Sequence, residues 1–374
     1  MNKQSIPLGR ILGISVGLDY SWFIVFGLLT WSLAISYYPH EFKDWATGLY
    51  WLMGAITAIM LFVSVLLHEL GHSIVALRYK IPVNKITLFI FGGVAEITKE
   101  PPSAGAEFWI AIAGPAVSFS LAIIFYLMEP LFSAVAPIFA LAKYLALING
   151  MLALFNLIPG FPLDGGRVFR AIVWGITRDL RRSTIIAANV GRFIAFLFIF
   201  FGVLQMFGGN LVGGIWIAFI GWFLESAAIA QVQLQAVQGI LAGHKVYEAM
   251  NPKCPLLPPE ATLAELVDRY VLGTGQRCFV VQNNDRIEGM LTLHQIRKIP
   301  KDAWPETTIS QAMIPLADVK VTRPDVELAE ALKEMDRDGV NQLLVISNGE
   351  LLGMLSREDV IDYMRRLEAF AIPK

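Results

Sequence analysis

The sequence is poor in charge, because only 16% of its 374 residues are Asp, Glu, Lys or Arg, against about 25% in an average soluble domain. Hydrophobic residues make up 55% of the chain, and the mean hydropathy is +0.57. This composition excludes an ordinary soluble protein and indicates a chain that lies mostly in a membrane. The formal net charge of −1 implies no general affinity for nucleic acid, so no nucleic-acid partner is expected.

Cysteine is almost absent as well, and the N-terminus lacks a cleavage signal. Cys254 and Cys278 form no CxxC pair and lie in the hydrophilic C-terminal part, so we expect reduced thiols and neither a disulfide nor a cysteine metal site. Lys3 and Arg10 precede the first apolar stretch, but no small-residue cleavage site follows. This pattern predicts an uncleaved first membrane span.

Long apolar runs are plentiful, and six of them reach the length of about 20 residues that crosses a bilayer as a helix. The segment "VNKITLFIFGGVAEITKEP" between the second and third runs is too short and interrupted for a span. Its β-branched and aromatic residues predict a strand pair or a membrane-associated hairpin. The expected spans are approximately residues 18–38, 48–77, 107–128, 134–157, 184–207 and 211–233.

Basic residues are distributed unevenly between the two sides of these spans. The loops on one side of the predicted bundle carry Lys3, Arg10, Arg78, Lys80, Lys85, Lys99, Arg167, Arg170, Arg178, Arg181 and Arg182. The opposite loops offer only Lys43, close to two acidic residues. The positive-inside rule therefore places both termini and the hydrophilic C-terminal part in the cytosol. We expect a multi-pass protein of a prokaryotic plasma membrane.

The second apolar run ends in the motif HELGH, which puts His68, Glu69 and His72 at membrane depth. Two histidines four residues apart face the same side of a helix. That spacing suits one zinc ion, and the glutamate between them suits a base that takes a proton from water. The five-residue motif also occurs by chance, but ionisable groups inside a membrane are rare and usually functional.

A third metal ligand is expected at the same depth, and Asp164 is the candidate. It lies in "LINGMLALFNLIPGFPLDGGR" at the end of the fourth span, on the same side of the membrane as His68 and His72. Prolines and glycines around it predict a non-helical backbone. Such backbone at membrane depth must be buried in protein or line a wet cavity. A plain cytosolic turn remains the alternative for this segment taken alone.

HELGH followed by "NLIPGFPLDGG" resembles the site-2 protease family of intramembrane zinc metallopeptidases, over residues 1–235. The resemblance implies that His68, His72 and Asp164 bind one Zn²⁺ per chain and that Glu69 is the catalytic base. It also implies that Asn156 helps to position the substrate or the developing oxyanion. "FIFGGVAEI" resembles a family strand whose edge meets the unwound substrate. "AIAGPA" fits the third family helix, where close helix packing explains its small residues.

The implied activity is hydrolysis of peptide bonds within or near transmembrane segments. Its partners are transmembrane protein substrates and the surrounding lipid bilayer. A substrate helix has its carbonyl groups bonded internally, so we expect it to unwind before it is cut. The fold class that follows is a polytopic α-helical membrane domain of six transmembrane helices with a short β-strand element, joined to a soluble α/β module.

That soluble module contains an internal repeat. "RCFVVQNNDRIEGMLT" in the first copy corresponds to "NQLLVISNGELLGMLS" in the second, and each copy predicts extended segment, helix, strand, turn, strand and helix. Two such copies pack as a pseudo-symmetric pair. They resemble a tandem of cystathionine-beta-synthase (CBS) domains, at residues 246–301 and 308–367. The resemblance implies a module that modulates the protease.

CBS pairs often bind adenine nucleotides through a Ser or Thr followed three residues later by Asp. Ser356 and Asp359 match this pattern in the second copy, whereas Thr292 is followed by Gln295 in the first, which lacks the carboxylate. Ser356 and Asp359 also fit a plain helix cap. An adenine nucleotide and a homodimer formed through the CBS domains are therefore both candidate interactions.

Two other classes of function compete with a protease. A CBS-gated transporter or channel would explain the spans and the soluble module, with intramembrane His and Asp forming an ion path. It leaves Glu69 within HExxH and the second motif unexplained. A catalytically silent scaffold predicts the loss of a ligand, and none of the expected ligands is missing.

Overall fold

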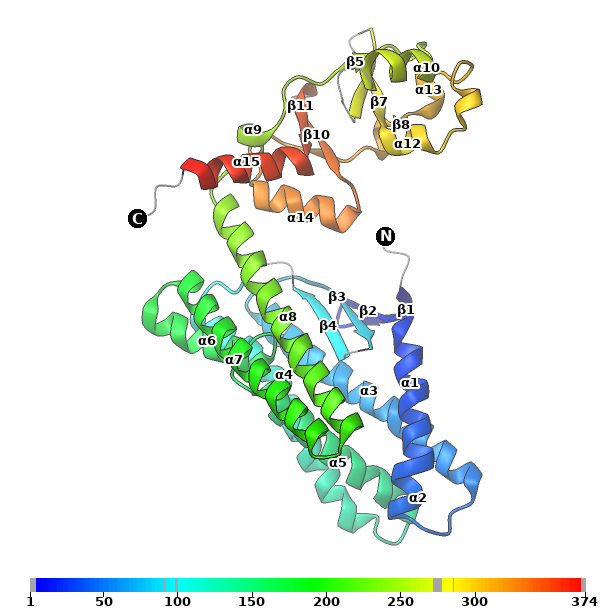
Figure 1. Cartoon of the computed structure of the whole chain (residues 1–374), viewed down its shortest axis with the longest axis vertical. Helices are drawn as coiled ribbons and strands as arrows, with labels where there is room; N and C mark the ends of the chain where they lie inside the picture. Colours follow the sequence, from blue (N-terminus) through cyan, green and yellow to red (C-terminus); the bar gives the residue numbers. More distant parts are fainter. Residues whose placement is uncertain (1–4, 91, 98–99, 272–277, 285, 371–374) are drawn as a thin grey trace. The chain divides into compact units, whose positions relative to one another are not determined.

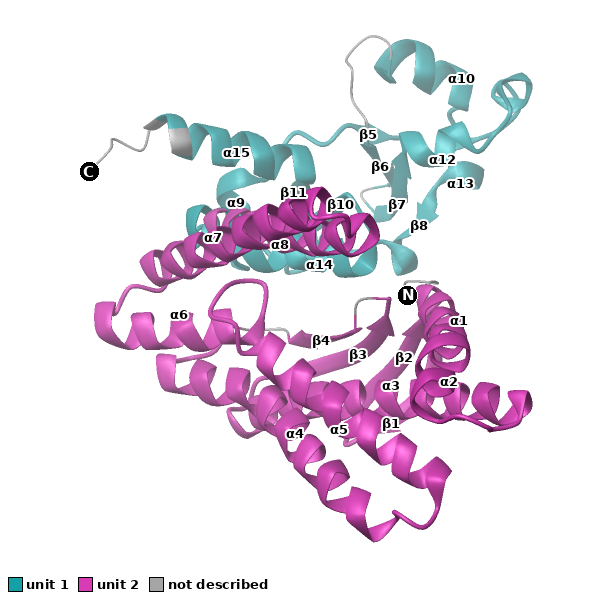
Figure 2. Ribbon diagram, turned by 60° about the horizontal axis from the view of Figure 1, so that its bottom comes forward, with its two compact units in different colours: residues 1, 237–374 teal, residues 2–236 magenta. Residues whose placement is uncertain are grey.

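The computed structural model describes residues 5–90, 92–97, 100–271, 278–284 and 286–370. The chain forms two compact units, residues 2–236 and residues 237–374, which we call the helical unit and the C-terminal unit (Figure 2). Some residues used in the sequence predictions lie outside the described residues: Lys3 and Lys99 of the basic loops, Phe91 of the strand pair, and Arg277 and Asp285 of the first repeat.

Six helices among the described residues are long and apolar enough to cross a membrane, which confirms the six predicted spans. The first combines α1 (Ser21–Ser32), a π-helical turn (Leu33–Tyr37) and α2 (Tyr38–Glu41). The others are α3 (Thr47–Arg78), α4 (Ala104–Leu131), α5 (Ala136–Asn156), α7 (Leu180–Phe207) and α8 (Leu211–Leu241). Large apolar side chains such as Phe207 and Val212 are 88% and 81% exposed, as lipid-facing positions require.

A seventh, shorter helix, α6 (Asp164–Thr177), lies between α5 and α7. The predicted non-helical backbone holds for residues 157–163 but is wrong from Asp164 onward, because Asp164 is the first residue of α6. Gly165 and Gly166 occupy its first turn because neighbouring backbone leaves no room for a side chain at either position. A Cβ at Gly165 would lie 2.3 Å from the Leu157 carbonyl oxygen, and one at Gly166 would lie 2.3 Å from the Gly160 carbonyl carbon.

The helical unit also contains a four-stranded sheet in the order β1-β2-β3-β4 (Figure 1). The predicted strand pair is confirmed as the antiparallel strands β3 (Val83–Phe89) and β4 (Gly92–Ile97). The hairpin of β1 (Ser5–Ile11) and β2 (Ile14–Asp19) was not predicted. Its two-residue turn has positive φ at Leu12 and Gly13, and a leucine is an unusual residue for such a turn.

This sheet packs against the part of α3 that carries HELGH. The buried cluster joins residues of β2, of β3 and of the segment before β3 to α3 and α4: Ile14, Leu70, Ala76, Ile81, Val83, Ile86 and Ile110. In the cytosol-side half of α3, as the basic residues orient it, the side that carries His68 and His72 is therefore buried in protein, whereas Leu67, Ile74 and Leu77 stay exposed. That enclosure provides the buried setting in which polar groups are tolerated.

The C-terminal unit consists of two α/β repeats, each with the predicted order of elements. The first contains α9 (Val246–Ala249), β5 (Leu256–Leu257), α10 (Leu263–Leu266), a π-helical turn (Val267–Val271), β6 (Cys278–Asn283), β7 (Arg286–Thr292), α12 (Leu293–Arg297) and a 3₁₀ turn (Lys301–Ala303). The second contains α13 (Ile309–Ala312), β8 (Ile314–Pro315), a 3₁₀ turn (Leu316–Asp318), β9 (Val321–Thr322), α14 (Leu328–Asp338), β10 (Gln342–Ser347), β11 (Glu350–Ser356) and α15 (Arg357–Phe370).

The strand registers of the two repeats match in detail. In both, a parallel pair (β5 with β6, β9 with β10) adjoins an antiparallel hairpin (β6 with β7, β10 with β11). Val281 pairs with Gly289 in the first hairpin and Val345 pairs with Gly353 in the second, and a shift of register follows each pair. The same irregularity at the same place is what an internal duplication predicts.

The hydrophobic core of each repeat includes residues that belong, by their place in the sequence, to the other repeat or the segment before it. Leu241, Val246 and Ala249, which precede the first repeat's strands, pack with Leu328 and Val360 of the second repeat. Ile309 and Ala312 pack with the first repeat's core instead. Each repeat is thus completed by the short helix that precedes the other repeat's strands.

Both cysteines are free thiols, as predicted. Cys278 is buried on β6, and burial raises the pKa of its thiol to about 12. Burial also raises the pKa of the Cys254 thiol to about 11. Since the thiolate is the nucleophile and metal ligand, neither side chain supplies one at neutral pH.

Small residues let the transmembrane helices α7 and α8 approach closely, which leads to a stability prediction. A Cβ at Gly202 would lie 2.6 Å from the Ala218 nitrogen and 2.7 Å from the Gly214 oxygen. We expect Gly202→Ala to lower the free energy of unfolding by about 1–3 kcal/mol through overpacking, measured by thermal unfolding in detergent. Gly27→Ala is the control, because nothing lies within 4 Å of its Cβ position; equal effects of both changes would contradict the prediction.

Candidate metal centre

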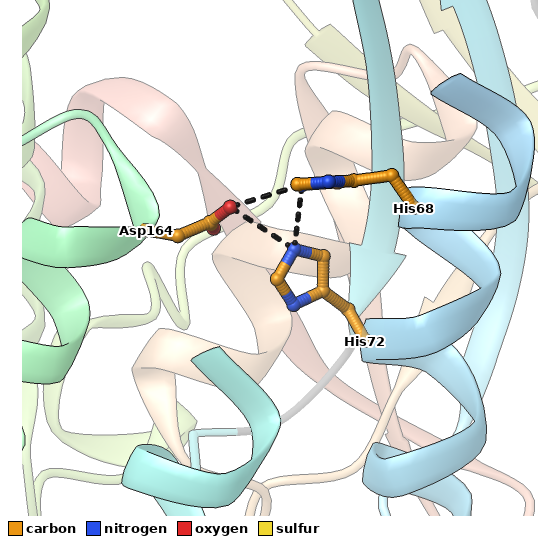
Figure 3. A group of neighbouring side chains, drawn as sticks. All are labelled: His68, His72 and Asp164. Carbon is orange, nitrogen blue, oxygen red and sulfur yellow. Dashed lines mark hydrogen bonds and ion pairs between the residues drawn. The ribbon is translucent and has the colours of Figure 1, made fainter. Parts of the chain in front are cut away.

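Two histidines of α3 and the first residue of α6 converge on one point inside the helical unit (Figure 3). His68 and His72 are each only 4% exposed. Their Nε2 atoms lie 3.2 Å apart, and Asp164 Oδ2 lies 3.0 Å from His68 Nε2 and 3.2 Å from His72 Nε2. The structure therefore brings together all three residues that the sequence predicted as metal ligands.

The other ring nitrogens of the two histidines are already engaged. His72 Nδ1 donates a hydrogen bond of 2.7 Å to the carbonyl oxygen of Ile110, so its neutral ring carries the lone pair on Nε2. His68 Nδ1 lies 2.8 Å from the hydroxyl oxygen of Ser118. Hydrogen bonds of this kind fix the ring orientation and the tautomer of metal-binding histidines, and they leave both Nε2 atoms pointing at Asp164.

The distances fit a zinc ion. In a tetrahedral zinc site with bonds of about 2.0 Å, neighbouring ligand atoms lie about 3.3 Å apart. The three separations of 3.0–3.2 Å between His68 Nε2, His72 Nε2 and Asp164 Oδ2 are close to that value. Two imidazoles and one carboxylate are also a ligand set that catalytic zinc uses, with its fourth position open.

Glu69 lies beside this group and beneath strand β4. A Cβ at Gly93 of β4 would lie 2.4 Å from Glu69 Cγ and 3.2 Å from Glu69 Oε1. Glu69 also interacts electrostatically with His72 and Asp164. The glycine therefore lets the backbone of β4 pass directly over the carboxylate.

Gly114 of α4 provides the space around the imidazoles. A Cβ at this position would lie 2.1 Å from His72 Nε2 and 2.6 Å from His68 Nε2, so both imidazoles would have to move to admit it. The sequence prediction explained the small residues of "AIAGPA" by close helix packing. That explanation suits Ala113, whose carbonyl oxygen would lie 3.0 Å from a Cβ at Gly71, but Gly114 faces the candidate ligands.

The segment before Asp164 is held by backbone contacts that only glycine permits. A Cβ at Gly160 would lie 2.4 Å from the Gly191 Cα atom on α7, and a Cβ at Gly191 would lie 2.4 Å from the Phe161 carbonyl oxygen. Phe161 is buried with Ala187 and Ala188 of α7. These contacts fix the loop that leads into α6, and with it the position of Asp164.

Asn156, the remaining predicted site residue of the helical unit, ends α5. Its side chain is partly exposed and makes no hydrogen bond to the part of the chain that the structure describes. Its assignment to the oxyanion or the substrate remains a prediction. A second asparagine was missed: Asn149 of α5 is fully buried and donates hydrogen bonds to Ser64 Oγ and to the Leu145 carbonyl oxygen.

Other contributors were also missed, for different reasons. Ser118 and Gly114 lie four residues apart in "GPAVS", a spacing that puts them on one helix face, so the pattern carried a usable signal. The backbone carbonyl group of Ile110 could not be predicted as a partner of His72, because every residue has such a group. Arg170 was counted among the cytosolic loop charges, whereas it is buried and paired with Glu107.

In the C-terminal unit, Ser356 and Asp359 hydrogen-bond to each other. The backbone N–H of Ser356 donates to Asp359 Oδ2 at 2.8 Å, and the backbone N–H of Asp359 donates to Ser356 Oγ at 3.1 Å. The Ser356 hydroxyl also donates to Asp359 Oδ2, at 2.5 Å. This is the reciprocal cap at the start of α15 that the alternative prediction described. Thr292 caps α12 in the first repeat by accepting from the Gln295 backbone. Nucleotide binding at Ser356 and Asp359 remains a prediction.

The position of Gly114 gives a direct test of the metal centre. We expect Gly114→Ala to weaken zinc binding at least about 10-fold, because the added methyl group displaces the imidazoles. Zinc content and affinity of the purified full chain in detergent are the measurements. Gly105→Ala in the same helix is the control, because nothing lies within 4 Å of its Cβ position. Full zinc affinity in Gly114→Ala would show that the metal lies elsewhere.

Comparison with known proteins identifies the relatives of this chain. The family model for Peptidase family M50 matches residues 56–138 and 132–200, and that for the CBS domain matches residues 246–302 and 305–366. The chain is 36% identical to Rip3 of Mycobacterium tuberculosis over 363 residues, 96% of this chain and 92% of that protein. It is 32% identical over 366 residues to the zinc metalloprotease MJ0392 of Methanocaldococcus jannaschii, covering 98% of each.

A solved structure, the site-2 protease from Methanocaldococcus jannaschii, is 33% identical and covers 61% of this chain and 95% of its own, with a TM-score of 0.42. The sequence relatives match both the part with the candidate ligands and the C-terminal repeats, over nearly their full lengths. The protein is therefore a multi-pass membrane protein of the site-2 protease family, Peptidase family M50, with a C-terminal pair of CBS domains.

Proposed function

We propose that the protein is an intramembrane zinc metallopeptidase that hydrolyses peptide bonds within or near transmembrane segments of other membrane proteins. The observation that carries the proposal is the convergence of His68, His72 and Asp164 at distances that suit a tetrahedral zinc ion. These ligands lie in a unit of six membrane-spanning helices. Polar groups at such depth are expensive without a function.

His68, His72 and Asp164 hold the zinc ion, one per chain. When bound, zinc polarises a carbonyl oxygen and lowers the pKa of a coordinated water to about 7. Glu69 takes the proton of the attacking water and then donates it to the leaving amine as the carbon–nitrogen bond breaks. Its place beside His72 and Asp164 supports this role.

Strand β4 is the proposed contact for the unwound substrate. It is at the edge of the sheet and pairs with β3 within the described sheet. An edge strand offers unpaired backbone groups to an extended peptide. Gly93 of this strand lies against Glu69, so a substrate added beyond β4 reaches the catalytic carboxylate. Asn156 is the proposed residue for positioning the substrate or the developing oxyanion.

The proposed orientation places both termini and the CBS pair in the cytosol of a prokaryotic cell, with the protein in its plasma membrane. Arg170 no longer counts as a loop charge, because it is buried. The described loops on the assigned cytosolic side still carry an excess of basic residues, namely Arg10, Arg78, Lys80, Lys85, Arg167, Arg178, Arg181 and Arg182. That excess supports the assignment.

The CBS pair is proposed to modulate the protease, with an adenine nucleotide as its candidate ligand. Ser356 and Asp359 offer a hydroxyl and a carboxylate at the start of α15, groups that suit a ribose. A homodimer through the CBS domains is the proposed assembly.

Zinc content and cleavage together test the protease. We expect about one zinc per chain in the wild type, full zinc but no cleavage in Glu69→Gln, and weakened zinc binding in Asp164→Asn. The measurements are zinc per chain in detergent and cleavage of an unstructured membrane-anchored substrate.

Glu129→Gln serves as the matched control, since Glu129 is a carboxylate in the last turn of α4. It should keep both zinc and cleavage. A wild type without zinc, or a Glu69→Gln protein that cuts normally, contradicts the proposal and favours the CBS-gated transporter or channel.

Nucleotide binding needs a test that separates it from helix capping. Asp359→Asn removes the carboxylate that accepts from Ser356, so we expect about 1 kcal/mol lower stability of the C-terminal unit and ATP binding weakened at least about 10-fold. Calorimetry on the full chain measures the affinity, and Gln295→Ala at the matching position of the first repeat is the control. Loss of stability with unchanged ATP affinity would leave Asp359 as a cap alone.

A further inference from the structure

One face of α4 orients both histidines of the metal centre. Ile110, Gly114 and Ser118 follow each other at intervals of four residues, so they share one side of the helix. Ile110 accepts from His72 Nδ1, Ser118 contacts His68 Nδ1, and Gly114 leaves room for both rings. This face therefore fixes two of the three candidate ligands.

The same face begins one turn earlier with Glu107, three residues before Ile110. Glu107 is completely buried, and its Oε1 accepts hydrogen bonds from Nε of Arg170, at 2.6 Å, and from Nη2 of the same side chain. Its second oxygen, Oε2, has no partner among the described residues. Arg170 thus supplies every hydrogen bond that this buried carboxylate receives in the described structure.

Arg170 connects this pair to the third ligand. It is 5% exposed and lies on α6, the helix whose first residue is Asp164. Its guanidinium carbon lies 5.2 Å from the centre of the Phe161 ring, three residues before Asp164. Its Nη1 also donates to Thr184 Oγ1 of α7 at 3.4 Å. One guanidinium group therefore contacts α4, α7 and the segment that leads into the ligand.

We propose that Glu107 and Arg170 are positioning residues that set the place of Asp164 relative to His68 and His72. Without this pair, α4 would still orient the histidines, but α6 would lose the ion pair that joins its middle, at Arg170, to α4. A buried ion pair is weak evidence for stability, since apolar replacements are often neutral. We connect the pair with the metal centre because its two hydrogen bonds fix how α6 lies against α4. The inference rests on the proposed function, because it assumes that zinc binds here.

Zinc affinity and the spectrum of the cobalt-substituted protein test this inference without any cleavage assay. Glu107→Gln keeps the size of the side chain, and Arg170→Lys keeps the charge but loses the two-pronged contact. We expect each change to weaken zinc binding about 10- to 100-fold, as loss of a ligand's supporting partner does. We also expect altered visible absorption bands of bound Co²⁺, because the Asp164 oxygen moves. The double variant should bind zinc no more weakly than the single variant with the lower zinc affinity, because the two residues act through each other.

Glu41→Gln is the matched control. It breaks another ion pair of the helical unit, between Glu41 and Lys143 at 2.8 Å, which involves none of the three candidate ligands. Its zinc affinity should stay within about twofold of the wild type, and its cobalt spectrum should be unchanged.

A variant that replaces both residues with leucine keeps the test valid if the single variants fold poorly. Removing both charges avoids a buried unpaired group, so this protein should fold and still bind zinc about 10- to 100-fold more weakly. Wild-type zinc affinity in the double-leucine variant would overturn the positioning role, whatever the single variants show. A wild type that binds no zinc would instead overturn the proposed function, so the two failures are distinct.

Discussion

Ionisable groups at membrane depth are stable only when other protein groups satisfy them, and this constraint organises the helical unit around α4. His72 donates to the Ile110 carbonyl group, and His68 meets the Ser118 hydroxyl. The carboxylate of Glu107 and the guanidinium group of Arg170 form a buried ion pair that joins α4 to α6, and Arg170 bonds one of the two carboxylate oxygens. A single helix between α3 and α6 therefore both shields the polar groups from lipid and determines how they face one another.

The second constraint is the shortage of space for side chains around the site, and glycine residues satisfy it. Gly114 clears the volume that the imidazoles occupy, and Gly93 lets β4 cross above Glu69. Around the loop before α6, backbone touches backbone at Gly160 and Gly191. A rigid site results, because atoms of the main chain have less freedom to move than the ends of long side chains.

The sequence predicted the parts of this site that depend on local spacing. His68 and His72 share a helix face through their separation of four residues, and Asp164 followed from the side of the membrane on which its segment lies. The partnership of Glu107 and Arg170 could not be predicted, since 63 residues separate them and a buried arginine looks like any other loop charge in a sequence. The hairpin of β1 and β2 was missed because its turn lacks the usual Asn-Gly or Asp-Gly signal.

The crossed cores of the CBS pair have a consequence for synthesis on the ribosome. The second repeat's core needs Leu241 and Val246, made early, together with Val360, made near the end of the chain. The first repeat's core spans only Leu257 to Ala312, so it can close while translation continues. During that interval Leu241 and Val246 lack the residues of the second repeat that bury them in the finished protein.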